Sequence, residues 1–156
     1  MRRTIHERLS RLFVGAAIGI VTVGGCAAMK APEVWSLQTA SEIPAAAGNV
    51  KVKPEKSGNT KVEVAVEHLA PATVAFGSPN YVVWIVPQTG SAGEPDIAGQ
   101  AQNMGQLSVG SDLKGSFKTT TAFKTFEVIV TAEATPNVTT PGSNRVMTSA
   151  VIHLPT

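Results

Sequence analysis

The sequence predicts an all-β protein: an antiparallel two-sheet β-sandwich of seven or eight strands behind an N-terminal export segment. Apolar and polar residues alternate over several short segments after residue 49, which is the period of a strand with one buried face. Turns rich in Gly and Pro separate these segments, and no helical periodicity follows the leader. The expected architecture is immunoglobulin-like without the Cys–Cys pair of true immunoglobulin domains, and a small open barrel is the alternative.

Residues 1–25 have the features of a lipoprotein signal peptide. Arginines precede an apolar run from Leu12 to Val23, and these twelve residues are too few to span a hydrocarbon core of about 30 Å. The run ends in Val23-Gly-Gly-Cys26, which resembles the bacterial lipobox, where a diacylglycerol is attached to the cysteine thiol. Cys26 is the only cysteine, so it can form no disulfide within the chain. Lipidation at Cys26 is predicted; an ordinary small residue of a cleaved leader or membrane anchor is the alternative.

Lipidation implies export to the bacterial cell envelope and attachment to a membrane. Ala27, in place of Asp, resembles the sorting pattern for the outer membrane, facing the periplasm, in a cell with two membranes. Residues 26–48 are rich in Ala, Pro and Ser and are expected to form a tether. A short strand at Val34–Leu37 is expected to dock on the domain, because exposing Trp35 would be costly.

The chain beyond the leader is close to electrically neutral. The sequence holds 13 basic and 11 acidic side chains, but residues 1–25 contribute four arginines and one glutamate. Nine basic and ten acidic groups remain, a net charge of −1. Arg145 is the only arginine of the sequence beyond residue 25. No basic stripe is evident, so no nucleic-acid partner is predicted.

The β domain, expected over residues 49–156, is organised around one strand that is apolar on both faces. Tyr81, Val83 and Ile85 alternate there with three more apolar residues, so the strand needs cover on both sides. The segment Gln88–Gln102 is expected to be a loop and a place for variable function. The expected strands of the domain are Val50–Val52, Thr60–His68, Tyr81–Val86, Leu107–Val109, Leu113–Thr119, Phe123–Ala132 and Arg145–Leu154.

Six short phrases carry a resemblance to known proteins. They are Pro44-Ala-Ala-Ala-Gly48, His68-Leu-Ala-Pro71, Tyr81-Val-Val-Trp84, Leu113-Lys-Gly115, Phe123-Lys-Thr-Phe126 and Val130-Thr-Ala-Glu133. In this order they resemble a family of uncharacterised bacterial exported proteins over about residues 44–151. Residues 81–147 are also similar to the extracytoplasmic C-terminal domain of anti-sigma factors of the sigma-K regulator type.

These resemblances imply the fold and an envelope address, and they supply no catalytic residue. No segment of this sequence is predicted to form the sigma-binding helical domain or the spanning helix of such anti-sigma factors. The protein is therefore not expected to hold a sigma factor itself.

No catalytic constellation is predicted. Beyond the leader the histidines are His68 and His153, and no nucleophile-elbow motif surrounds a serine. His68 is in phase with the preceding valines, which predicts a hydrogen-bonded histidine at the rim of the core rather than a catalytic base. A copper or zinc site could recruit these histidines with Met104 and Met147, but no two of them fall at ligand spacing, and methionine ordinarily fills cores.

The acidic residues have structural interpretations as well. Glu94, Asp96 and Asp112 lie in or beside expected loops, where solvated carboxylates are the default and weak calcium binding is the alternative. Glu133 is expected to form an ion pair with Arg145 or with a lysine across the sheet.

The function predicted from these observations is that of a bacterial envelope lipoprotein whose β-sandwich is a non-catalytic interaction or structural module. It is expected to be no enzyme, to need no cofactor and to have an envelope protein as partner. The alternative is a lipoprotein that binds a small ligand or a copper or calcium ion through the Gln88–Gln102 loop and the His/Met set.

Overall fold

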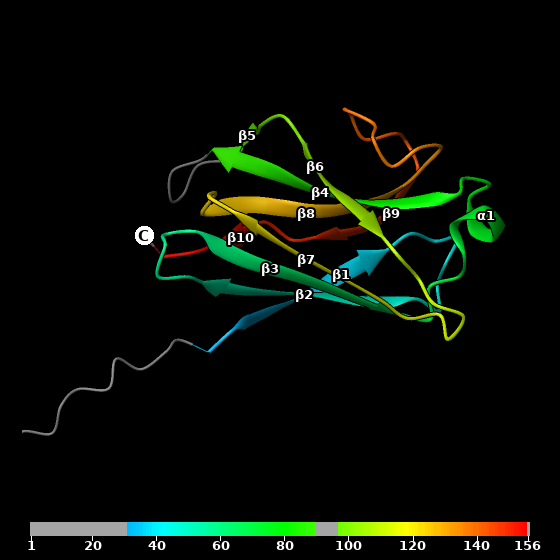
Figure 1. Ribbon diagram of the computed structural model, residues 1–156, viewed down its shortest axis with the longest axis horizontal. Helices are drawn as coiled ribbons and strands as arrows, with labels where there is room; N and C mark the ends of the chain where they lie inside the picture. The colour runs from blue at the N-terminus through cyan, green and yellow to red at the C-terminus, as the bar shows by residue number, and fades with distance from the viewer. Residues whose placement is uncertain (1–30, 90–96, 156) are drawn as a thin grey trace, which may run out of the picture.

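A computed structural model of the protein describes residues 31–89 and 97–155 (Figure 1). Within these residues the chain forms antiparallel strands and one short helix, so the predicted all-β class is confirmed. The elements are β1 (Glu33–Thr39), β2 (Ala47–Pro54), β3 (Thr60–Glu67), α1 (Ala72–Ala75), β4 (Asn80–Thr89), β5 (Ile97–Ala98), β6 (Gln102–Leu107), β7 (Gly115–Thr121), β8 (Thr125–Glu133), β9 (Arg145–Ser149) and β10 (Ile152–His153).

The strands belong to one continuous path of antiparallel pairs. The path runs β6-β4-β8-β9-β1-β2-β3-β7, with β5 paired to β4 and β10 paired to β8. The sheet curls until its end strands, β6 and β7, approach each other through the turn at 108–114 and a bridge between Val109 and Gly115 (Figure 1). A division into two sheets is not confirmed, and the curled sheet is closer to the small open barrel.

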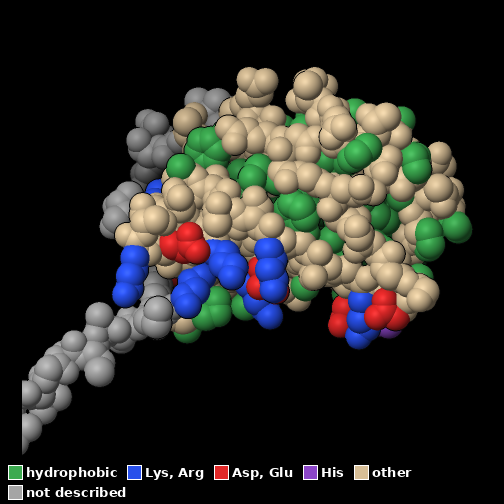
Figure 2. Space-filling view, viewed as in Figure 1, with side chains coloured by type: hydrophobic (Ala, Val, Ile, Leu, Met, Phe, Trp, Pro, Cys, Tyr) green, Lys and Arg blue, Asp and Glu red, His purple; other side chains and the backbone are tan. Residues whose placement is uncertain are grey.

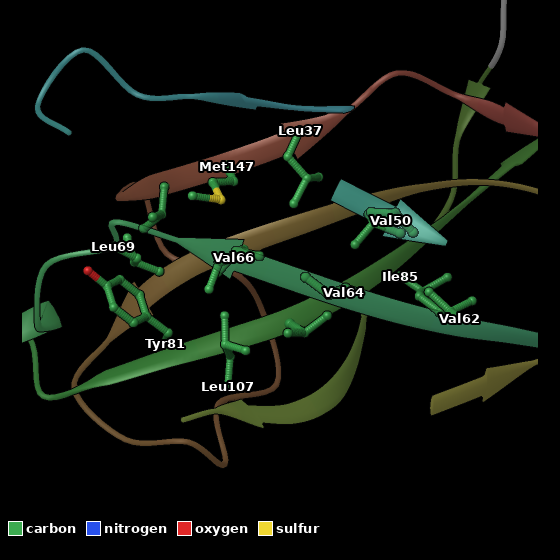
Figure 3. Close-up of a cluster of buried hydrophobic side chains, with 14 of the residues drawn as sticks. Leu37, Val50, Val62, Val64, Val66, Leu69, Tyr81, Ile85, Leu107 and Met147 are labelled. Atoms are coloured by element: carbon green, nitrogen blue, oxygen red, sulfur yellow. The ribbon is translucent and has the colours of Figure 1, made fainter. Parts of the chain in front are cut away.

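The main core fills the inside of the curled sheet. Alternation along β2 and β3 turns their valines inward, as in Val50, Val62 and Val64, which are completely buried (Figure 3). From β4, Tyr81 and Ile85 point into the same cluster (Figure 3). Burying each such side chain stabilises the fold by about 1.5–3 kcal/mol before entropy is counted, so this cluster is the main source of stability.

The expected strand at Val34–Leu37 is confirmed and is longer than predicted. As β1 it lies between β2 and β9 in the sheet, with Trp35 opposite Val50 and Leu37 opposite Ser149. Trp35 is half-buried against the main core, which is the docking that its cost of exposure predicted.

The prediction of a loop over Gln88–Gln102 is wrong at both ends of that range. β4 continues through Pro87 to Thr89, and its last residues pair with β5. Pro87 lies opposite Phe126 of β8. On the other edge of β4, Pro87 falls between the residues that pair with β6 and those that pair with β5. The missing N–H of Pro87 therefore interrupts neither of those two ladders. Residues 90–96, with Glu94 and Asp96, lie outside the described residues.

Other boundaries differ for local reasons. The strand predicted at 107–109 overlaps β6 only at Leu107. β6 begins earlier, at Gln102, in a polar stretch that shows no apolar alternation. Leu113 has φ 61° in the preceding turn, so β7 begins only at Gly115. The last predicted strand is split into β9 and β10, because the Ser149 hydroxyl accepts a bond from Val128 N and donates one to Ala150 O.

Candidate functional site

The outer face of β4 carries a second apolar cluster, separate from the main core. Val82, Trp84 and Val86 are buried there with Ile129 of the neighbouring β8. Val138, from the loop at 134–144 between β8 and β9, packs against them. The prediction that this strand needs cover on both faces is therefore confirmed, and on the outer face the cover includes a loop.

A chain of hydrogen bonds joins this cluster to the loop. Trp84 Nε1 donates to Thr131 Oγ1 at 2.7 Å, and the Thr131 hydroxyl donates to Glu133 Oε1 at 2.6 Å. The same carboxylate oxygen accepts the backbone N–H of Gly142 at 2.7 Å. Since Trp84, Thr131 and Glu133 are all buried, the chain satisfies polar groups that water reaches poorly and fixes the loop over the indole.

The ion pair expected for Glu133 is wrong. Among the described residues no lysine or arginine lies at salt-bridge distance from its carboxylate, and Arg145 is exposed. Gly142 leaves room for the carboxylate, because a Cβ there would lie 2.9 Å from Glu133 Oε2. Glu133 is thus an anchor for the backbone of the loop.

A second anchor comes from β6. The side-chain amide of Asn103 donates to Pro136 O at 2.9 Å and to Val138 O at 2.7 Å, while its oxygen accepts the N–H of Gly105 at 2.9 Å. The register of β4 against β6 shifts at this level, and Gly105 has φ +129°, a conformation that favours glycine. One asparagine therefore holds both the bulge and the loop.

Between the bulge and the loop lies an open hollow of about 690 Å³, called here the β6 groove. Its lining is uncharged: amides, a hydroxyl, backbone and small apolar groups. The lining residues are Asn103, Met104, Gly105, Gln106, Pro136, Asn137, Val138 and Thr139. Gln106 is oriented by a bond from its amide to Asn80 Oδ1 at 2.9 Å. The β6 groove offers donors and acceptors without charge, which suits a neutral polar ligand or the backbone of a peptide.

A smaller hollow of about 410 Å³ lies between the loop at 42–46 and α1, and its lining includes Glu42 and His68. Val74 of α1 is 78% exposed beside it. In Figure 1, α1 and the loop between β8 and β9 lie away from the point where β1 begins. The hollows therefore mark one end of the domain.

The expectation for His68 is wrong. β3 ends at Glu67, His68 is exposed with φ 54°, and Leu69 takes the buried position. The left-handed residue breaks the alternation from which the buried histidine was inferred.

The proposed His/Met set is not assembled by the fold. Met147 is buried with its sulfur near Gly48, Met104 lines the β6 groove, and His153 lies in β10 opposite Thr125. Within residues 31–89 and 97–155 no three His, Cys, Asp or Glu side chains are grouped as a metal site would need. Asp112 is exposed, and its carboxylate accepts the N–H of Lys114 in its own turn.

The six phrases of the sequence have roles in the fold. The Tyr81 hydroxyl donates to Ala70 O at 2.7 Å, and Leu69 N donates to Leu113 O at 3.0 Å, so three of the phrases meet. The bond from Trp84 to Thr131 adds a fourth phrase, Val130–Glu133. Burial raises the pKa of Tyr81 from its ordinary value of 10.0 to about 12, because the phenolate would lose its hydration.

Comparison of the chain with protein-family models, curated proteins and solved structures finds no match. In the part of the chain that the structure describes, no helix has the length and apolar character needed to cross a membrane. Cys26 lies outside the described residues.

Sequence reasoning missed Asn103, Gln106 and Asn137. The available signal was the amide-rich stretch from Gln100 to Gln106, which lacks apolar alternation but contains a glycine where a bulge occurs.

Proposed function

We propose that the protein is a lipid-anchored protein of the bacterial envelope whose β domain is a non-catalytic interaction module. Its binding site is the β6 groove, and its partner is an exported protein that contributes an extended, uncharged segment. The observation that carries this proposal is the groove itself, because hydrogen bonds of buried and half-buried side chains hold its walls.

The lining favours recognition of a peptide over catalysis. Asn137 and Thr139 are exposed at the rim, and the groove contains no carboxylate, imidazole or thiol to serve as a base or nucleophile. β6 pairs with β4 on one side and makes few contacts with β7 on the other, so its outer edge can accept an added strand.

The proposal includes the two-layer, immunoglobulin-like arrangement expected from the sequence. In it, the β6-β4-β8-β9 half of the curled sheet faces the β1-β2-β3-β7 half across the main core. Strands of both halves contribute buried side chains to the one main core, which supports this arrangement.

The anchor is tested by Cys26→Ser, with Ala27→Ser as the matched control. If a diacylglycerol on the thiol holds the protein at the membrane, the Cys26→Ser protein moves to the soluble fraction of the envelope and the control stays. Fractionation followed by mass spectrometry of the N-terminal peptide measures both. A Cys26→Ser protein that sediments with membranes as the unaltered protein does would contradict the anchor.

The β6 groove is tested by placing a charge in it. Asn137→Lys should lower cross-linked recovery of the partner from native envelopes at least tenfold, since the bound peptide would cover the ammonium at the rim and its backbone cannot neutralise it. Ser111→Lys, in the exposed turn at 108–114, is the control and should leave recovery unchanged. Equal recovery with both variants would show that the groove is not the site.

The competing ligand-binding function is tested by titration. Copper or calcium that binds only the folded protein must raise its melting temperature. We expect no rise with either ion, and a saturable rise would favour the metal-binding function over the interaction module.

A further inference from the structure

The lysines of the domain are gathered on one face. Among the described residues, six of the seven lysines lie on β2, β3 and β7 or at the turn that joins β2 to β3. They are Lys51, Lys53, Lys56, Lys61, Lys118 and Lys124, and together they define the lysine face. Lys124 belongs to it because its ammonium donates to Gly58 O at 2.6 Å in that turn.

The pairing of the strands produces this clustering. Val50 and Val52 point inward, so Lys51 and Lys53 point outward. Lys53 lies directly opposite Lys61 across β2 and β3, and in the next outward row Lys51, Glu63 and Lys118 lie side by side. Like charges directly opposite each other destabilise a sheet, so the fold carries a local electrostatic cost that an external anion would relieve.

The lysine face makes the domain strongly dipolar. Six lysines against Glu55, Glu63 and Glu67 give this face a net charge of +3. Among the other described residues, Lys114 and Arg145 stand against five carboxylates, a net charge of −3. Figure 2 shows most of the blue side chains, with red ones among them, along the lower edge near the start of β1, while the upper part of the same view is mostly uncharged. The near-zero total charge conceals this separation.

The lysine face lies where the chain enters the domain. Val34, near the start of β1, pairs with Lys51 and is 59% exposed, so an apolar side chain lies beside the lysines. Six residues lie between Cys26 and Glu33, and a fully extended chain over these seven steps spans at most about 25 Å. A lipid on Cys26 would therefore keep the lysine face close to the membrane surface.

We propose that the lysine face docks on anionic phospholipid headgroups. The inference rests on the proposed lipid anchor, and it adds an orientation: the lysine face lies on the membrane, and the β6 groove points away from it. Attraction is appreciable only within the Debye length of about 8–10 Å, which the short connection to Cys26 allows. Each lysine near an anionic surface strengthens binding about fivefold.

The test is amine labelling of the full-length, lipidated protein in vesicles, followed by peptide mass spectrometry. One vesicle contains phosphatidylcholine alone and the other contains phosphatidylcholine with phosphatidylglycerol. Lys118 and Lys114 are a matched pair: their side chains are 59% and 57% exposed, and each forms an ion pair with a glutamate, at 3.6 Å and 3.3 Å. Lys118 lies on the lysine face and Lys114 in the turn before β7.

We expect Lys61 and Lys118 to label about fivefold more slowly on the anionic vesicles, and Lys114 to label equally on both. Molar salt should remove the difference, because it shortens the Debye length to about 3 Å. Equal labelling of Lys118 on both vesicles, or equal protection of Lys114, would overturn the proposal. Protection by a soluble polyanion such as heparin but not by anionic vesicles would overturn it in favour of a polymeric partner.

Flotation separates this inference from the anchor. The anchored protein floats with neutral vesicles, and failure to do so contradicts the anchor alone. The proposal for the lysine face is still tested in that case, because slower labelling of Lys118 on anionic vesicles supports it and equal labelling contradicts it. The double variant Lys53→Gln/Lys61→Gln should reduce the protection of Lys118, whereas Lys114→Gln should not.

Discussion

The two faces of β4 are both buried, but by different means. On the inner face, Tyr81, Val83 and Ile85 are covered by the other strands of the curled sheet. On the outer face, Val82 and Trp84 are covered in part by a loop that polar side chains hold in place.

The difference shows where a β domain of this kind has room for function. Strands that close a core satisfy their backbone groups by pairing with each other. A loop that covers a core needs other hydrogen-bond partners for its backbone groups. Here Glu133 accepts the N–H of Gly142, and Asn103 donates to Val138 O. Because the loop meets β6 through side chains and not through a ladder, a groove lies between them, and its polar lining is available to a partner.

The largest effect is expected from Trp84→Ala. Removing a fully buried indole that also donates to Thr131 should lower the free energy of unfolding by about 3–5 kcal/mol. Urea denaturation followed by circular dichroism measures this change. Val74→Ala, at a side chain that is 78% exposed, is the control and should cost less than about 0.5 kcal/mol. A loss below about 1 kcal/mol for Trp84→Ala would show that the outer cluster is not a second core.

A smaller and more local effect is expected from Glu133→Ala. Thr131 and Gly142 would both lose their acceptor, which should cost about 1–3 kcal/mol. Hydrogen exchange should rise in the loop at 134–144 and stay unchanged in β2 and β3. Glu127→Ala, on the same strand, is the control. Unchanged exchange in the loop after Glu133→Ala would mean that the carboxylate does not hold it.

The smallest effect at neutral pH is expected from Tyr81→Phe, which removes one hydrogen bond worth about 1 kcal/mol. Burial raises the pKa of Tyr81 to about 12, so the folded protein keeps a proton that the unfolded chain releases near pH 10. The stability that this group contributes is present below pH 10 and is lost as the pH rises from 10 to 12. Melting temperatures over this range should fall more steeply for the unaltered protein than for Tyr81→Phe. Parallel curves would mean that Tyr81 ionises as freely in the folded state as in the unfolded chain.

The sequence predicted those parts of the fold that depend on local pattern. The two apolar faces of Tyr81–Val86 and the alternation of Val62, Val64 and Val66 identify the strands directly, and the cost of exposing Trp35 identifies β1. The position of β6 was not predictable in this way, because its residues show no apolar alternation.

The candidate sites depend on pairings that no local pattern contains. Asn103 is a site residue because the chain returns to it more than thirty residues later, at Pro136 and Val138. The lysine face arises from the register of three strands, which places Lys53 against Lys61 and brings Lys118 beside them. The prediction for His68 is wrong for a different reason. The alternation that placed His68 inward is clear in the sequence, but the left-handed backbone of His68 itself ends that alternation.

The most direct test of an envelope interaction module with its site at the β6 groove is photo-cross-linking in native envelopes. A photoreactive amino acid replaces Asn137 at the rim of the groove, and in a matched protein it replaces Ser57 in the turn between β2 and β3. Cross-linking from position 137 to a single exported protein, absent from position 57 and reduced by Cys26→Ser, is the expected result. Equal cross-linking from the two positions, or cross-linking from position 57 alone, would contradict it.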